Sequence, residues 1–156
     1  MRLTIVAVGR LRRGPLSELF EDFQMRVDRT GAQRGLGPLS VIEVEDKTGQ
    51  GTQAEAALLS RALPKDAHII ALDERGKTPT SPRFAQQIET LRDRGIANCV
   101  FLIGGADGLA PDLRDAAHSR LSFGPMVWPH MLARVMLAEQ LYRATAILTG
   151  APYHRA

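Results

Sequence analysis

The sequence predicts an α/β fold in which a mostly parallel sheet is flanked by helices, and three observations support this. Short apolar runs rich in β-branched residues alternate with segments whose apolar residues recur at helical spacing. The most apolar run, residues 97–104, has the composition of a central strand buried on both faces. No repeat or linker interrupts the alternation in the 156 residues. We therefore expect one domain, residues 1–156.

The first half of the chain supplies two strands and two helices. Residues 2–9 are rich in β-branched side chains and end at a glycine, which predicts a strand, and residues 39–46 predict a second one. Between them, residues 15–29 place apolar side chains on one helical face. Thr52 and Glu55 have the spacing of a capping box, so we expect a second helix to begin there and to end before the next proline.

The second half continues the alternation. Residues 67–73 predict an apolar strand that ends at the polar sequence ERGK. A serine followed by a proline at position 82 begins a helix that ends at Gly95, because proline is tolerated in the first helical turn. After the strand at 97–104, we expect a short helix over residues 111–118 and a short strand over residues 120–124.

Two glycine-bearing loops follow strands of the same sheet. The first is the glycine turn at 104–108, and the second is an irregular loop at 123–128. Trp128 precedes a proline and so favours extended backbone, which puts the start of the last helix at Pro129. In open α/β sheets ligands bind outside the carboxyl ends of the strands, so these loops are a candidate binding site.

Charge and composition restrict the partners of the chain. The net charge is +3 and the aromatic content is 5%, so base stacking on an aromatic platform is not expected to be the main way of holding nucleic acid. Arg10, Arg12 and Arg13 cluster after the first strand and form either a solvated face or a phosphate-contacting patch. Cys99 is expected to be a small buried hydrophobe rather than a nucleophile.

Metal and membrane sites are not expected. The four histidines and the lone cysteine have no metal-site spacing, and a single thiol fits a reducing compartment. The longest apolar segment, residues 131–148, is interrupted by charged residues and should not span a membrane. These features predict a cytoplasmic protein.

The last helix and the tail carry the remaining polar groups. His130 and Arg134 share one helical face and can serve either a site or the structure, whereas Glu139 and Arg143 are interpreted as a helix-surface ion pair. The sides between these pairs are apolar, so the helix is expected to pack against the sheet and a second subunit. The tail, residues 153–155, either frays or contributes chemically capable groups.

Six stretches, taken together and in this order, resemble the RlmH family. These are the SPOUT-class, trefoil-knotted methyltransferases that methylate N3 of a pseudouridine in 23S rRNA. The resemblance covers essentially the whole chain and is densest after residue 67. The stretches are AVGR (7–10), LDERGK (72–77), FLIGGADGL (101–109), LSF (121–123), WPHMLARVMLAEQLYRA (128–144) and PYHR (152–155).

The resemblance implies a C-terminal trefoil knot and a pocket in which S-adenosylmethionine lies bent between the knotted loops. The glycine turn is then interpreted as leaving room for this cofactor. Pro125 has no N–H, so a contact there must use its carbonyl or ring. Carried over to this sequence, the cofactor-binding residues are Leu72, Gly104, Gly105, Phe123, Gly124, Pro125, Met126, Val127 and Trp128.

The resemblance also implies a homodimer that acts on 23S rRNA, with the tail of one subunit completing the pocket of its partner. The acceptor nitrogen must lose a proton, and a nearby cation or base would help. We assign Arg10, Arg12 and Arg13 to rRNA phosphates and expect the assembled ribosome to be the substrate. The catalytic candidates are His154, Arg155 and Tyr153, followed by His130 and Arg134.

Two other classes of function stay open at this point. A flavodoxin-like or dehydrogenase-like enzyme would need phosphate donors at a helix N-terminus, but the sequence GGADG lacks the G-x-G-x-x-G order. A non-catalytic ribosome-binding module would explain the basic charge, but it would leave the glycine loops and the PYHR stretch without a role.

Overall fold

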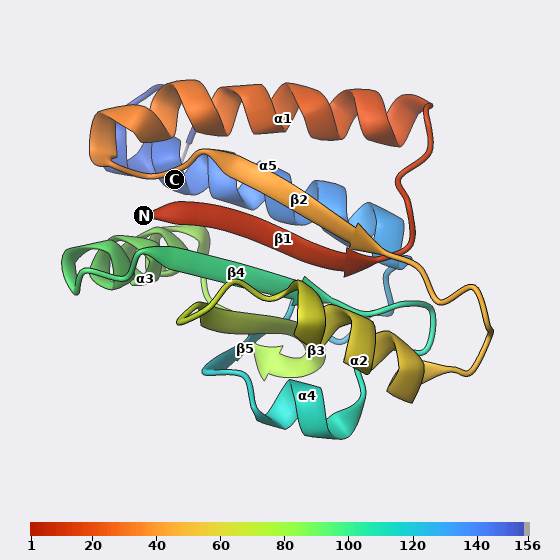
Figure 1. Ribbon diagram of the computed structural model, residues 1–156. Coiled ribbons are helices and arrows are strands. Elements are labelled where there is room, and N and C mark those ends of the chain that lie inside the picture. Colours follow the sequence, from red (N-terminus) through yellow and green to blue (C-terminus); the bar gives the residue numbers. More distant parts are fainter. Residues whose placement is uncertain (155–156) are drawn as a thin grey trace.

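The computed structural model describes residues 1–154, which form a five-stranded parallel sheet with the strand order β2-β1-β4-β3-β5 (Figure 1). Because the strands are parallel, all their carboxyl ends lie at one edge of the sheet. This agrees with the fold class predicted from the alternating pattern. The strands are β1 (Arg2–Val8), β2 (Leu39–Val44), β3 (His68–Lys77), β4 (Asn98–Ile103) and β5 (Ser119–Leu121).

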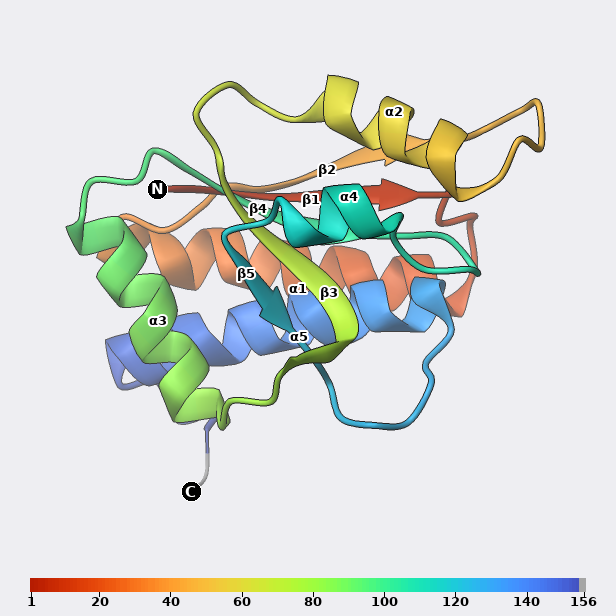
Figure 2. The same cartoon turned by 90° about the horizontal axis from the view of Figure 1, so that it is seen from below.

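Helices cover both faces of the sheet (Figures 1 and 2). Leu3 and Ile5 of β1 are buried in one apolar cluster with side chains of the three longer helices that lie on that face. Val6 belongs to a second cluster, on the face covered by the two shorter helices. The period-2 alternation of a strand thus feeds two cores. The first group is α1 (Pro15–Gly31), α3 (Ser81–Asp93) and α5 (His130–Thr149), and the second is α2 (Thr52–Ala62) and α4 (Pro111–Asp115).

The last helix, α5, lies against α1, α3 and the sheet. Leu137, Ala138 and Leu141 are at most 1% exposed, so the apolar sides recognised in the sequence are largely buried within one chain. A short 3-10 turn, η1 (Ala32–Arg34), follows α1. Pro129 is the N-cap of α5, in agreement with the expected start.

Strand β3 is longer than expected and does not end at the sequence ERGK. Leu72 and Lys77 both pair with Leu121, so the residues between them bulge out of the ladder. At this point the backbones of β3 and β5 touch. A Cβ on Gly76 would lie 2.7 Å from the carbonyl carbon of Leu121. The polar sequence was misread as a strand end because the pairing resumes after the bulge.

Two further expectations are corrected. The N-cap of α2 is Gly51 and no side chain caps this end, so Thr52 and Glu55 do not form a capping box. Instead the Glu55 carboxylate lies beside Gly105 of the glycine turn. The short helix α4 ends at Asp115, before the expected boundary.

The remaining composition-based expectations concern the thiol, metals and membranes. Cys99 is fully buried, and burial raises the pKa of its thiol to about 12, which agrees with a structural role. Within residues 1–154 no three histidine, cysteine or acidic side chains are grouped so that they could hold a metal ion. Over the same residues no helix is both long and apolar enough to span a membrane.

Candidate active site

A cavity of about 330 Å³ lies at the carboxyl edge of β3, β4 and β5. Its lining comes from the bulge of β3, the glycine turn after β4, the loop after β5 and the first turn of α5. Eight of the nine residues predicted to bind the cofactor line it, and the exception is Pro125. The eight are Leu72, Gly104, Gly105, Phe123, Gly124, Met126, Val127 and Trp128.

The glycine turn is folded against itself and against α2. Gly108 donates its N–H to the Gly105 carbonyl at 3.1 Å. A Cβ on Gly104 would lie 2.3 Å from a backbone atom of Gly108, and a Cβ on Gly105 would lie 2.9 Å from Oε1 of Glu55. The space that these glycines leave is therefore filled by protein atoms. Their backbone lines the cavity, but the reason for glycine is close packing of the turn, which corrects the reason given from the sequence.

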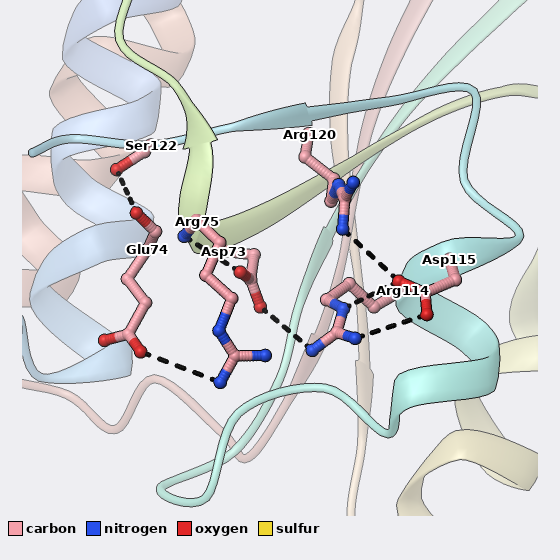
Figure 3. Close-up of polar contacts among 7 residues, drawn as sticks. All are labelled: Asp73, Glu74, Arg75, Arg114, Asp115, Arg120 and Ser122. Atoms are coloured by element: carbon pink, nitrogen blue, oxygen red, sulfur yellow. Dashed lines mark hydrogen bonds and ion pairs between the residues drawn. The ribbon is translucent and has the colours of Figure 1, made fainter.

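The bulge of β3 supplies a polar wall that sequence reasoning missed. Asp73 accepts a hydrogen bond from the Arg75 N–H at 2.9 Å, and its other carboxylate oxygen lies 4.0 Å from a guanidinium nitrogen of Arg114 (Figure 3). The side chains of Asp73 and Arg114 are only 12% and 13% exposed. A usable signal existed, because these residues directly follow Leu72 at the rim where ligands bind.

Arg114 is held from its other side. Its Nε donates to Asp115 at 2.9 Å, and Asp115 also pairs with Arg120 at 3.3 Å (Figure 3). The hydrogen bond from Arg114 lowers the pKa of the Asp115 carboxyl and raises the pKa of the guanidinium. The chain Asp73–Arg114–Asp115–Arg120 thus links β3, α4 and β5 and fixes the polar wall.

The loop after β5 is tied to the bulge by Ser122. Its hydroxyl accepts a hydrogen bond from the Gly124 N–H at 3.0 Å and lies 3.2 Å from the Glu74 carbonyl, to which it donates (Figure 3). Met126 and Val127 beyond this tie are 68% and 84% exposed. The far wall of the cavity therefore presents apolar side chains to solvent, which is typical of a surface that a ligand or partner covers.

His130 and Arg134 have separate fates although they share a helix face. His130 lines the cavity, and burial, followed by the nearby Arg134 charge, lowers the pKa of its imidazole. Arg134 is fully buried and does not line this cavity. Its guanidinium contacts Glu43 at 2.5 Å and the backbone of the loop after β1.

The tail folds back onto α5 instead of fraying. The Tyr153 hydroxyl donates to Glu139 Oε1 at 3.0 Å, and its ring lies 4.4 Å from the Tyr142 ring and 4.9 Å from the Arg143 guanidinium carbon. Burial, and then the bond to Glu139, raises the pKa of the Tyr153 phenol. The predicted Glu139–Arg143 pair is present, but its carboxylate also anchors the tail.

The structure does not bring the tail to the cavity of its own chain. Neither Tyr153 nor His154 lines the cavity. Nδ1 of His154 is buried and has no hydrogen-bond partner among the described residues. Arg155 lies outside the described residues.

The comparisons with known proteins cover the same span as this fold. The sequence pattern of the family described as "Predicted SPOUT methyltransferase" matches residues 1–154.

The chain belongs to the SPOUT methyltransferase family.

The RlmH resemblance noted from the sequence motifs is confirmed by curated relatives within this family. A protein of Dinoroseobacter shibae named "Ribosomal RNA large subunit methyltransferase H" is 62% identical, and the alignment covers 99% of each chain. A protein of the same name from Ruegeria pomeroyi is 58% identical with the same coverage. Among solved structures, a probable methylase family protein from Haemophilus influenzae shares the fold with a TM-score of 0.53 at 12% identity, covering 99% of this chain and 70% of that chain.

A second, mostly apolar groove of about 620 Å³ lies beside the candidate site of this SPOUT chain. Leu19 and Phe23 of α1 form part of it together with Met136 of α5. Phe123 and Gly124 line both hollows, so a molecule bound in the groove would touch the wall of the first cavity. Glu139, which anchors the tail, also lines this groove.

Proposed function

We propose that the protein is an S-adenosylmethionine-dependent methyltransferase that acts on large-subunit ribosomal RNA. The observation that carries the proposal is that the two glycine-bearing loops, predicted separately from the sequence, line one cavity at the carboxyl edge of the sheet. The chain's family and the names of its full-length relatives support the same activity. We assign the methyl acceptor to N3 of a pseudouridine in 23S rRNA and the site of action to the ribosome in the cytoplasm.

The lining of the cavity fits S-adenosylmethionine. Leu72, Phe123 and Trp128 offer apolar surface for an adenosyl group, and Asp73 and Glu74 offer carboxylates to a ligand that carries an ammonium and a sulfonium. Because Asp73 is 12% exposed and partly neutralised by Arg114, it would favour a cation without needing a large rearrangement. When bound, the sulfonium supplies an already activated methyl group, so the task left to the chain's own residues is alignment.

The remaining chemistry concerns the acceptor nitrogen, which must lose a proton. His154 is our first candidate for assisting this step, because its Nδ1 has no partner in one chain and stays free to engage another group. Arg155 is a candidate for stabilising the developing anion. The Tyr153 hydroxyl is already committed to Glu139, so we assign it to holding the tail in place.

We further propose that the active form is a homodimer in which a second copy of the chain occupies the apolar groove. The groove shares Phe123 and Gly124 with the cavity, and the tail anchor Glu139 lines its rim. Since the tail does not reach the cavity of its own chain, it would act in the partner's cavity. The knot implied by the family would place the threaded segment at this same interface.

The first experiment measures cofactor choice and substrate together. Calorimetry should detect binding of S-adenosylmethionine but not of NAD or FMN. Methyl incorporation should be found with assembled ribosomes, and mass mapping should locate it in 23S rRNA. A chain that binds ribosomes without transferring methyl would leave only the binding-module function.

The second experiment tests the tail. His154→Ala should lower turnover while leaving the affinity for S-adenosylmethionine unchanged. Mixing this variant with Trp128→Ala, which alters the cavity, should restore about a quarter of the wild-type sites, because each mixed dimer holds one intact site. Unchanged turnover of His154→Ala would contradict the role of the tail, and absence of restored activity would contradict the shared site.

A further inference from the structure

Arg134 is the largest fully buried side chain among the described residues, and it is buried as a charge. Its Nη1 donates to Glu43 Oε1 of β2 at 2.5 Å. Its Nη2 donates to the carbonyls of Val8 and Gly9 at 3.2 Å and 2.9 Å. Burial lowers the pKa of the guanidinium and Glu43 opposes this effect. Burying a charge in this way is costly, so the contacts are expected to serve a purpose beyond stability.

Glu43 holds the same loop from the other side. Its Oε1, which contacts Arg134, also accepts a hydrogen bond from the Leu11 N–H at 2.8 Å. The segment after β1 is therefore fixed at Gly9 by Arg134 and at Leu11 by Glu43. We call residues 9–13 the arginine loop, because it carries Arg10, Arg12 and Arg13.

The arginine loop also touches the first turn of α5. A Cβ on Gly9 would lie 2.8 Å from Cε of Met131 and 3.4 Å from Nε2 of His130. His130 in turn lines the candidate active-site cavity. The backbone of the loop is thus in close contact with the wall of the cavity, and Arg134, one helical turn further along, fastens it there.

The side chains of the loop point outward from this fixed backbone. Arg10, Arg12 and Arg13 are exposed. Arg10 pairs with Glu45 at 3.2 Å, and within residues 1–154 neither Arg12 nor Arg13 has a carboxylate partner. Two guanidinium groups therefore remain free to contact phosphates at a set distance from the cavity.

We propose that Arg134 is a positioning residue, which acts through the arginine loop to fix where RNA phosphates bind relative to the methyl-transfer cavity. This inference rests on the proposed function. An arginine is suited to the role because its planar fork reaches the Glu43 carboxylate and two backbone carbonyls at once, whereas a lysine has one nitrogen. Arg134→Lys keeps the positive charge and loses part of this set of hydrogen bonds.

The test compares Arg134→Lys with Arg92→Lys. Arg92 also joins two carboxylates and a backbone carbonyl, but it does so on α3 and η1. We expect Arg134→Lys to raise the KM for ribosomes about tenfold with kcat within about twofold of wild type, because a mobile loop weakens phosphate contacts. The Leu11 amide should exchange faster with solvent. The Kd for S-adenosylmethionine should not change, and Arg92→Lys should change none of these quantities.

A double-substitution cycle separates positioning from general destabilisation. In an Arg12→Ala, Arg13→Ala background, Arg134→Lys should have little further effect on the KM, because the loop cations through which it acts are gone. Multiplying effects, or an unchanged KM and Leu11 exchange rate in the single variant, would overturn the inference. Glu43→Gln provides a second variant if Arg134→Lys does not fold.

The two proposals fail in different ways. If the wild-type protein transfers no methyl group to ribosomes, the proposed function fails, while Leu11 exchange still measures whether Arg134 fixes the loop. If wild-type transfer is found but Arg134→Lys changes neither KM nor exchange, only the positioning role fails.

Discussion

The anchoring of the tail by Glu139 can be tested with Tyr153→Phe. Phenylalanine keeps the ring contacts with Tyr142 and Arg143 and removes only the 3.0 Å hydrogen bond to the carboxylate. A hydrogen bond to a charged group contributes about 1.5–3 kcal/mol, and both partners are only part-buried, so we take about 1.5 kcal/mol. This corresponds to a roughly tenfold larger open population of the tail.

Amide exchange followed by NMR measures this opening directly. Ala151 donates its N–H to the Ala146 carbonyl at 2.9 Å, so its exchange should accelerate about tenfold when the tail opens more often. The Gly95 amide, bonded to Arg92 at the end of α3, should not change. Glu139→Gln combined with Tyr153→Phe should add little to either substitution alone, because both weaken one bond. An unaltered Ala151 exchange rate in Tyr153→Phe would refute this account.

Three other predictions concern the cavity, the strand crossing and the buried thiol. Trp128→Ala should weaken S-adenosylmethionine binding in calorimetry, whereas Pro125→Ala should not, because only Trp128 lines the cavity. Gly76→Ala should lower the free energy of unfolding by about 2 kcal/mol, and by more than Gly105→Ala does, since its Cβ meets backbone instead of a flexible side chain; equal losses in urea unfolding would contradict this. Because the pKa of Cys99 rises from 9.0 to about 12 on folding, the unfolded chain ionises first, and stability present below pH 9 is lost as the pH rises toward 12. At pH 10 this loss is about 1.4 kcal/mol, and its persistence in Cys99→Ala would disprove the cause.

The sequence by itself determined the order of the elements and most of the candidate cavity. Strand and helix periods, with glycine and proline at the boundaries, are local signals, so ten elements were placed close to their observed positions. The loop at 123–128 and the turn at 104–108 could be joined in one site because parallel strands end at one edge. Pro125 was wrongly included because spacing does not say which way a loop residue faces.

Only the tertiary structure decided which polar side chains act together. Arg134 and Glu43 are 91 positions apart, and Ser122 and Glu74 are 48 apart, so no local period relates them. Glu55 matched a capping pattern, yet the approach of the glycine turn drew its carboxylate away from the helix end. Such contacts arise when elements pack, because burying a charge or a backbone group requires a partner wherever the fold supplies one.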